Sequence, residues 1–400
     1  MNEVLEQLTA EQLDKEASAF DHHNAAYRDH SVEILDHIQA TRPFTHTTAH
    51  GGFWLATKGT ALLEITRNLG DFSSAHDIVI PPLQQPKQTP IHIDPPDLYD
   101  YRAILNPLFS PARMKARAAE IRALAAELMD DIVARGRGDV VLELAQPLTG
   151  RLTLRLLGIP EEDWPHYAVP MHELVYSTRP MEERLALTAP MYARLQREVR
   201  RLKEHPVPGS IMEYLHNVDM AGRKLRLDEI DSICMLMIGG GFDTTQALVG
   251  MAAVYLGRNP DRRQELVDEP DLIESATEEF LRVFPPTQGN SRRAINDVVV
   301  AGHTIKAGED VFMSWVAANR DPDEFEDPHK IDFRRENNRH YSFGLGPHRC
   351  LGSHLARLEA MACLEVLIAK APAYRLDEAG VEKAHDIGTV AGYNTVPIIV

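Results

Sequence analysis

The segment HYSFGLGPHRCLG, residues His340–Gly352, places glycines, aromatic rings, two histidines and one cysteine within thirteen consecutive positions. It runs into the stretch LGSHLARLEAMACLEVLIA, in which apolar residues recur at spacings of three and four, a pattern typical of a helix. Cys350 therefore lies at a predicted helix N-terminus, where free backbone N–H groups and the helix dipole stabilise a thiolate. Glycines allow a tight turn and let a flat ligand approach the backbone closely. The segment thus predicts a loop that presents one thiolate to a large ligand.

Two other interpretations of this loop are weaker. The pair Gly344 and Gly346 resembles half of a phosphate-binding glycine loop, but Arg349 stands where the third glycine is required. A zinc site needs four ligands in recognisable pairs, and neither Cys234 nor Cys363 supplies a CxxC partner. Both of these cysteines fall in apolar helical stretches, so we expect them to be buried as small hydrophobic residues.

The pattern F-G-x-G-x-H-x-C-x-G, residues 343–352, closely resembles the haem-binding loop of the cytochrome P450 superfamily. The resemblance implies a soluble, bacterial-type (class I) haem-thiolate enzyme. Its fold would be the cytochrome P450 fold, mainly α-helical with small antiparallel β-sheets. The implied cofactor is haem b (iron protoporphyrin IX), with Cys350 as the iron ligand and Phe343, Gly344 and His348 beside the porphyrin.

A second motif lies in the stretch LDEIDSICMLMIGGGFDTTQALVGMAAVYLG, residues 227–257, which predicts a long helix that is apolar on nearly all faces. An acid in such a helix is costly unless it has a partner or a task, and three consecutive glycines weaken the helix. The segment GGFDTT, residues 240–245, matches the Gly-Gly-x-Asp-Thr motif of the same superfamily. By this resemblance Asp243 and Thr244 form the acid–alcohol pair that delivers protons to dioxygen, so that its O–O bond can be cleaved.

The superfamily also carries a Glu-x-x-Arg pair on a helix, joined by a later arginine, which supports the cysteine side of the haem. The segment ATEEFLRVFPP supplies Glu279 and Arg282 on one helix face, and DFRRENNRH supplies Arg335. Taken alone, such a pair would more often be a solvated surface ion pair of little energetic value. Its distance before the cysteine loop favours the structural role.

The haem carboxylates need cationic partners once they are buried. By resemblance, Arg102 in DPPDLYDYRAILNPLFSP and Arg292 in NSRRAINDV take this role together with His348. The sequence departs from many relatives at Leu98, where they carry a histidine four residues before the first arginine. The missing contact is then lost or supplied from elsewhere, and the candidates to replace it are His92 and Asn290.

Composition narrows the classes of partner. The chain has 400 residues and a net charge of −17, which argues against nucleic acid or an anionic membrane surface as the main partner. It has no run of 18 or more apolar residues, so we expect no membrane insertion. Three cysteines are too few for a disulfide framework, and a reducing cytoplasm is the expected compartment.

Local patterns predict a large helical body with minor sheets. One helix is expected to end near Gly136. Three hairpins are predicted, turning at residues 50–52, at residues 301–302 and around Gly392. No repeat or flexible linker divides the chain, so we predict a single catalytic domain over residues 1–400.

The resemblance implies a monooxygenase that uses dioxygen to hydroxylate or epoxidise a hydrophobic small molecule, such as a terpenoid, a steroid or an aromatic compound. We expect a monomer that receives electrons from a separate ferredoxin served by an NAD(P)H-dependent reductase. The basic residues proposed for ferredoxin docking are Arg113, Lys115, Arg117 and Arg349, although an ordinary solvated helix face explains them equally well.

Substrate contacts are predicted along the buried helix and near the later hairpins. The predicted substrate-binding residues are Leu236, Gly240, Phe242, Gln288 and Tyr393. Gln288 and Asn290 are more polar than an apolar wall requires, so we hypothesise that they recognise one oxygen function of the substrate.

Other functions of the same scaffold were weighed against this one. A peroxide-driven haem enzyme or a non-catalytic haem binder or sensor would not need the Asp243–Thr244 pair. Oxidative coupling or rearrangement chemistry is excluded by no motif in the sequence.

Overall fold

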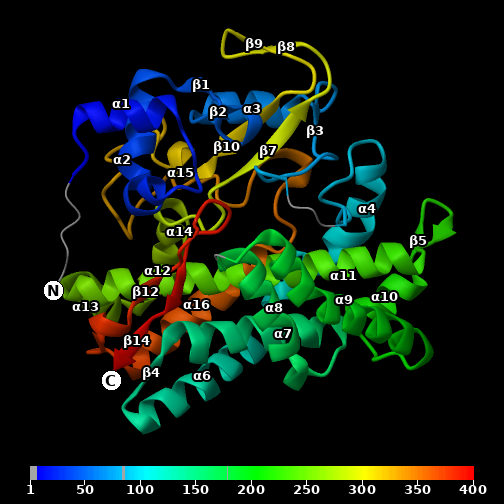
Figure 1. Cartoon of the computed structure of the whole chain (residues 1–400). Helices are drawn as coiled ribbons and strands as arrows, with labels where there is room; N and C mark the ends of the chain where they lie inside the picture. The colour runs from blue at the N-terminus through cyan, green and yellow to red at the C-terminus, as the bar shows by residue number, and fades with distance from the viewer. Residues whose placement is uncertain (1–6, 83–85, 178) are drawn as a thin grey trace.

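The computed structural model describes residues 7–82, 86–177 and 179–400. Long helices cross the lower part of the molecule, whereas the N-terminal helices and the largest sheet occupy the upper part (Figure 1). The predicted fold class, mainly α-helical with small β-sheets, is confirmed.

The helices of the described chain follow one another through most of its length. They are α1 (Ala10–Ser18), α2 (Ala25–Thr41), α3 (Gly59–Arg67), α4 (Asp97–Leu105), α5 (Pro111–Lys115), α6 (Ala118–Arg135), α7 (Gln146–Leu157), α8 (Pro165–Tyr176), α9 (Met181–Glu204), α10 (Ile211–Asn217), α11 (Leu227–Gly241), α12 (Asp243–Arg258), α13 (Pro260–Asp268), α14 (Ile273–Val283), α15 (Trp315–Ala318) and α16 (Ser353–Lys370). A π-helical segment, Val140–Ala145, leads into α7.

The strands are short and form several small sheets. They are β1 (Phe44–Thr47), β2 (Phe53–Ala56), β3 (Phe72–Ser73), β4 (Arg137–Asp139), β5 (Asp219–Met220), β6 (Arg223–Lys224), β7 (Gly289–Ala294), β8 (Val298–Val300), β9 (His303–Ile305), β10 (Asp310–Ser314), β11 (Arg375–Leu376), β12 (Glu382–Lys383), β13 (Tyr393–Thr395) and β14 (Pro397–Ile399). The largest sheet has the order β1-β2-β10-β7-β3, with β2 and β10 parallel.

Two of the three predicted hairpins are confirmed. Strands β1 and β2 pair antiparallel around a turn in which His50, Gly51 and Gly52 all have positive φ. Strands β8 and β9 pair antiparallel around Ala301 and Gly302, which also have positive φ. The helix predicted to end near Gly136 is α6, and Gly136 caps it with a left-handed φ of 67°.

The third hairpin prediction is wrong. Strand β13 pairs with β12, and β14 pairs with β11 and β4, so no two strands meet around Gly392. A Cβ at Gly392 would lie 3.0 Å from the Cβ of Ala247 and 3.1 Å from the Tyr176 hydroxyl. The glycine is therefore required by close packing against α12 and α8 rather than by a turn.

The predicted buried helix is present, but it is broken. Helix α11 ends at Gly241 and α12 begins at Asp243, with Phe242 at φ −86° and ψ −72° between them. By length and composition Leu227–Arg258 could cross a membrane, yet 67% of its most apolar window is buried inside the protein. That degree of burial is typical of a core helix, and Figure 1 shows it running through the middle of the molecule.

The main apolar core surrounds this broken helix and includes side chains of α6, α7, α12 and α16. Cys234 and Cys363 are both buried in it, as expected for structural cysteines. Burial raises the pKa of both thiols, so they remain protonated and unreactive.

Candidate active site

A cavity of about 730 Å³ lies where the broken helix faces the cysteine loop. Gly240 and Thr244 line it from the helix break, and Phe343 and Cys350 line it from the loop. The two motifs that sequence analysis singled out, more than a hundred residues apart, therefore open into one space.

The cysteine loop is held by its own backbone. The Cys350 N–H donates to the Phe343 carbonyl at 2.8 Å, and the Gly344 N–H donates to the Tyr341 carbonyl at 2.8 Å. Gly344 and Gly346 have φ of 67° and 65°, which other residues rarely adopt. A Cβ at Gly346 would also approach the Thr66 carbonyl oxygen to 2.8 Å, so this close contact requires glycine.

The Cys350 thiol lies two residues before the cap of α16, and its side chain is exposed to the cavity rather than to bulk water. Burial raises its pKa, while the Gly352 N–H and the charges of Arg102 and Arg349 lower it, with a net increase. The Gly352 N–H thus favours the thiolate, as expected at a helix N-terminus, although burial outweighs it. A bound cation would make it a thiolate, because coordination deprotonates a thiol outright.

Arg292, Arg102 and His348 line the cavity and have no acidic partner among the described residues. Arg292 is buried and donates only to the Ser291 carbonyl at 2.7 Å, and burial lowers its pKa to about 10. Arg102 donates to the Arg349 carbonyl at 2.9 Å, and burial lowers its pKa as well. Neither arginine forms a salt bridge in the described chain, so they fit a group that brings its own carboxylates, as haem does.

His348 is the third basic side chain of this set. Its Nε2 lies 3.2 Å from the Ser74 hydroxyl, and burial lowers its pKa to about 3, so the ring is neutral near pH 7. A neutral imidazole still offers one N–H to a carboxylate.

Leu98, the departure from the superfamily pattern, is fully buried and lines the cavity. Both candidates to replace the missing contact also line it. His92 Nδ1 accepts from the Gln88 N–H at 2.9 Å, which leaves Nε2 as the donor, 3.6 Å from Asp77. Asn290 accepts from the Trp315 indole at 3.1 Å. The His92 Nε2 donor thus faces Asp77, and the Asn290 amide donates to the Ile78 carbonyl at 3.3 Å, so the structure does not choose between the two candidates.

Asp243 and Thr244 face different surroundings. The Thr244 hydroxyl lines the cavity and donates to the Gly240 carbonyl at 2.9 Å. Asp243 is 2% exposed and points toward α8, where Oδ1 lies 3.3 Å from His172 Nδ1 and Oδ2 has no partner. The hydroxyl of Tyr176 also lacks a partner, and burial with the nearby Asp243 charge raises its pKa.

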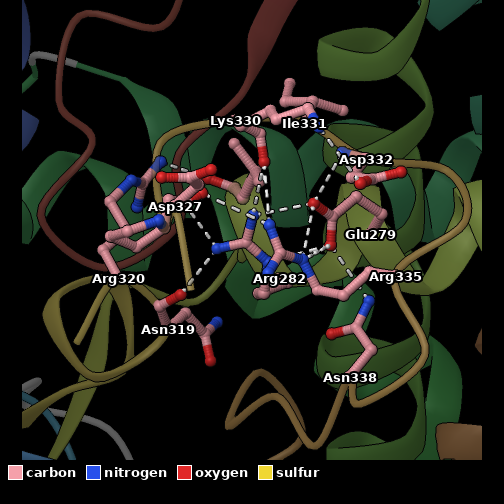
Figure 2. A network of polar contacts seen from close by, with 12 residues as sticks. Glu279, Arg282, Asn319, Arg320, Asp327, Lys330, Ile331, Asp332, Arg335 and Asn338 are labelled. Atoms are coloured by element: carbon pink, nitrogen blue, oxygen red, sulfur yellow. Dashed lines mark hydrogen bonds and ion pairs between the residues drawn. The ribbon is translucent and has the colours of Figure 1, made fainter. Parts of the chain in front are cut away.

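Glu279, Arg282 and Arg335 form one network of polar contacts (Figure 2). Glu279 and Arg282 are both fully buried and share two hydrogen bonds of 2.7 and 2.8 Å. Arg335 Nε donates to both Glu279 oxygens at 3.2 Å, and the Asp332 N–H adds a bond of 2.9 Å. Burial raises the pKa of Glu279, but these donors outweigh it and the pKa is lowered.

The same network ties together the chain that leads to the cysteine loop. Arg282 donates to the carbonyls of Asn319, Pro328 and Lys330, so one side chain holds three points of this segment. Every nitrogen of the buried Arg282 guanidinium has an acceptor, so this side chain is fully hydrogen-bonded.

The sequence did not reveal several residues around the site. Glu278 accepts from Arg357 at 2.6 and 2.9 Å, and that guanidinium lies 4.5 Å from the centre of the Phe343 ring. Glu359 of α16 lines the cavity, is 2% exposed and has one unpartnered oxygen, and burial raises its pKa to about 8. An acid within the apolar pattern of residues 351–364 was the signal available for Glu359.

The predicted substrate contacts divide into two groups. Leu236 and Gly240 line the cavity. Phe242 does not line the cavity, because it is 1% exposed and packs in the core. It lies two residues after Gly240 and therefore faces a different side of the helix. Gln288 accepts from the Tyr27 hydroxyl at 3.2 Å and donates to the Pro285 carbonyl at 3.0 Å, away from the cavity. Tyr393 packs against Gly250 of α12 and does not reach it either.

Comparison with known proteins agrees with this geometry. The family profile described as Cytochrome P450 matches residues 183–370. A probable cytochrome P450 127A1 from Sinorhizobium fredii is 32% identical over 347 residues, which are 86% of this chain and 83% of that protein. Vitamin D(3) 25-hydroxylase from Pseudonocardia autotrophica is 32% identical over 283 residues, 70% of each chain.

The fold is shared with solved structures. The crystal structure of CYP109E1 from Bacillus megaterium in complex with testosterone matches with a TM-score of 0.85 at 26% identity. The match covers 94% of this chain and 99% of that one. The chain belongs to the cytochrome P450 family of haem-dependent monooxygenases.

Proposed function

We propose that this cytochrome P450 binds haem b through Cys350 and inserts one atom of dioxygen into a hydrophobic small molecule by hydroxylation or epoxidation. The observation that carries the proposal is the shared cavity, into which Cys350 opens from one side and Thr244 from the other. When bound, the haem supplies the iron that activates dioxygen.

The residues around Cys350 hold and orient the cofactor. Phe343 and Gly344 line the cavity beside the thiol and leave a flat surface for a porphyrin. Arg102 and Arg292, which have no acidic partner in the described protein, would hold the haem carboxylates by charge-assisted hydrogen bonds. His348 adds a neutral N–H donor.

The break between α11 and α12 delivers protons to the cavity. The Gly240 carbonyl accepts from Thr244 rather than serving only the helix, so the hydroxyl is held at the cavity wall. Asp243 exchanges protons on the α8 side, where His172 contacts Oδ1 and Oδ2 has no partner, and its neighbour Thr244 presents the hydroxyl to the cavity. This division of labour keeps the acid away from the substrate while the alcohol faces it.

The cavity walls favour an apolar substrate. Side chains of α8 and α11 that line it include Met171, Leu174, Val175, Leu236 and Met237. Relatives named as a vitamin D(3) hydroxylase and as a complex with testosterone support a terpenoid, steroid or similar carbon skeleton for this protein too.

Electrons come from a separate ferredoxin-type donor with its NAD(P)H reductase, and the protein acts as a monomer in the cytoplasm. The docking surface lies around Arg113, Lys115 and Arg349, which are exposed, and Arg117, which pairs with Glu120 at 3.1 Å. These positive charges attract an acidic carrier to the cysteine side of the haem.

The proposal is tested by the spectrum of the reduced protein with carbon monoxide. The wild type should show the red-shifted Soret band of a thiolate ligand, and Cys350→Ala should abolish it. Cys363→Ala, which removes a buried thiol outside the site, should keep the band. An unshifted band in the wild type would overturn the assignment of Cys350.

A further inference from the structure

The cavity has a second polar region, separate from the haem site. Three charged side chains from distant segments line it, namely His23 in the N-terminal segment, Arg184 of α9 and Asp386 in the C-terminal segment. Most of the surrounding wall from α8, α9 and α11 is apolar. A few charges in an apolar cavity fix the orientation of a ligand, so they indicate which polar group the ligand carries.

His23 and Asp386 neutralise each other. His23 Nδ1 lies 2.9 and 3.0 Å from the two Asp386 oxygens, and Nε2 lies 2.8 Å from the Ile80 carbonyl. Both partners are acceptors, so both ring nitrogens donate and His23 is a cation. The Gly388 N–H adds a bond of 2.9 Å to Asp386. Asp386 is therefore satisfied within the protein and leaves no free negative charge.

Arg184 has no such compensation. Its Nη1 donates to the Leu174 carbonyl at 2.9 Å, while Nε is shielded from water and has no hydrogen-bond partner. In the described chain Arg184 forms no salt bridge, although it lies near enough to Asp386 to lower the pKa of that carboxyl. A buried donor without an acceptor is costly, and a missing ligand is one of the few explanations for it.

Two further charged side chains, Asp77 and Lys87, line the same part of the cavity. Asp77 accepts from the Ile78 N–H at 2.7 Å and lies 3.6 Å from His92, so it too is engaged. Lys87 lines the cavity, is exposed, and forms no salt bridge among the described residues. Among the described residues, the cations Arg184 and Lys87 on this wall thus have no ion-pair partner, while Asp386 is neutralised by His23 and Asp77 is bonded to the backbone.

We propose that Arg184 binds the carboxylate of the substrate, which is therefore an apolar carboxylic acid whose body lies along the apolar wall toward Thr244. The inference rests on the proposed function and narrows its substrate class. A guanidinium suits this task because its planar fork gives two parallel hydrogen bonds to one carboxylate. Arg184 takes the role that sequence analysis assigned to Gln288, whose amide is satisfied elsewhere.

The test is a spin-state titration of the ferric holoenzyme near neutral pH. The probes are dodecanoic acid and abietic acid, each beside its own methyl ester, so that a linear and a polycyclic body are each tested with and without the negative charge. We expect at least one acid to bind the wild type about tenfold or more tightly than its ester. Arg184→Met should remove that preference by weakening the acid and not the ester.

Arg200→Met is the matched control, because Arg200 lies on the same helix, is exposed and does not line the cavity. It should keep the preference for the acid. The inference is overturned if each acid and its ester bind the wild type equally, if Arg184→Met weakens both alike, or if neither acid shifts the spin state.

The carbon monoxide spectrum of every variant separates this inference from the proposed function. If the wild type shows no preference for the acid, or if Arg184→Met keeps that preference, while the thiolate band is present, only the role of Arg184 is contradicted. An unshifted Soret band in the wild type would contradict the assignment of Cys350 as the haem ligand, whatever the titrations show.

Discussion

The Glu279 network and the region of Asp243 and Arg184 differ in how their buried polar groups are paired. Glu279 receives hydrogen bonds from Arg282, Arg335 and the Asp332 N–H, so the buried acid is fully partnered. By contrast, Asp243 Oδ2 and Arg184 Nε are shielded from water and have no partner.

We call the Glu279 network the frame, because it holds its geometry without a ligand, and the region of Asp243, Thr244 and Arg184 the working surface. A buried network with all its partners present holds one geometry without any ligand, which suits the support of a cofactor loop. Orphaned donors and acceptors raise the free energy of the protein until something else pairs with them. We therefore expect the unpaired atoms at the helix break and around Arg184 to find their partners in transferred protons and in the substrate.

The largest expected effect comes from breaking the frame. Glu279→Gln removes the charge that compensates Arg282, which is fully buried, and should lower the free energy of unfolding by about 3 kcal/mol. Urea denaturation of the holoenzyme measures the loss. Glu274→Gln, an exposed change on the same helix, should shift it by less than about 0.5 kcal/mol. Equal urea midpoints for the two variants would show that the Glu279 network does not stabilise the fold.

The next effect concerns the working surface. Thr244→Ala removes the hydroxyl at the cavity wall and should lower product formation about 100-fold, with hydrogen peroxide released in its place. Its free energy of unfolding should change by no more than about 1 kcal/mol, unlike that of Glu279→Gln. Thr244→Ser keeps a hydroxyl and should recover most of the product. Unchanged product per NAD(P)H in the alanine variant would contradict the proton-delivery role.

A smaller effect is expected at the proposed docking surface for ferredoxin. Reversing charge at Arg113 and Arg117 together should slow reduction by ferredoxin about tenfold at low salt, and the difference should shrink as salt is added. Reduction by dithionite should stay the same. The control reverses Arg197 and Arg200, which are exposed on α9. If both double variants are reduced at the wild-type rate, the docking surface lies elsewhere.

The smallest effect is a dependence of the frame on pH. Burial alone would raise the pKa of Glu278, but His340 and Arg357 lower it to about 2. A lowered pKa in the folded state stabilises the protein above about pH 4.5, the ordinary value, and the gain is lost as the pH falls toward 2. Glu278→Gln should therefore be about 1 kcal/mol less stable at neutral pH.

Urea midpoints measured from neutral pH down to pH 3 test this sign. The difference between wild type and Glu278→Gln should narrow steadily below about pH 4.5. A gap that stays constant or widens with acid would show that the Glu278–Arg357 pair does not stabilise the loop.

Local motifs in the chain were sufficient to predict much of this site. The glycine spacing around Cys350, the i,i+3 pair Glu279 and Arg282, and the acid in an apolar helix are all short-range patterns. Their physical consequences, such as positive φ at Gly344 and a broken helix at Phe242, act within a few residues. The superfamily resemblance rested on these patterns, and the helical fold class followed from it.

Contacts between distant segments could not be predicted in the same way. His172 reaches Asp243 from another helix, and His23 reaches Asp386 across 363 positions of the chain. Gly392 was taken for a turn because glycine often marks one, whereas here it permits close packing against Ala247. Gln288 was taken for a cavity residue because a polar side chain in an apolar stretch needs a partner, and Tyr27 supplies that partner.

The cysteine loop, the ion pairs of Glu279 and the glycine-weakened stretch of the buried helix could therefore be predicted from the sequence, because backbone geometry and helix periodicity are local. Only the tertiary structure decided which side chains face the cavity and which polar atoms stay unpaired. Those properties depend on how helices such as α8, α9 and α12 pack, and packing brings together residues whose separation in the chain carries no signal.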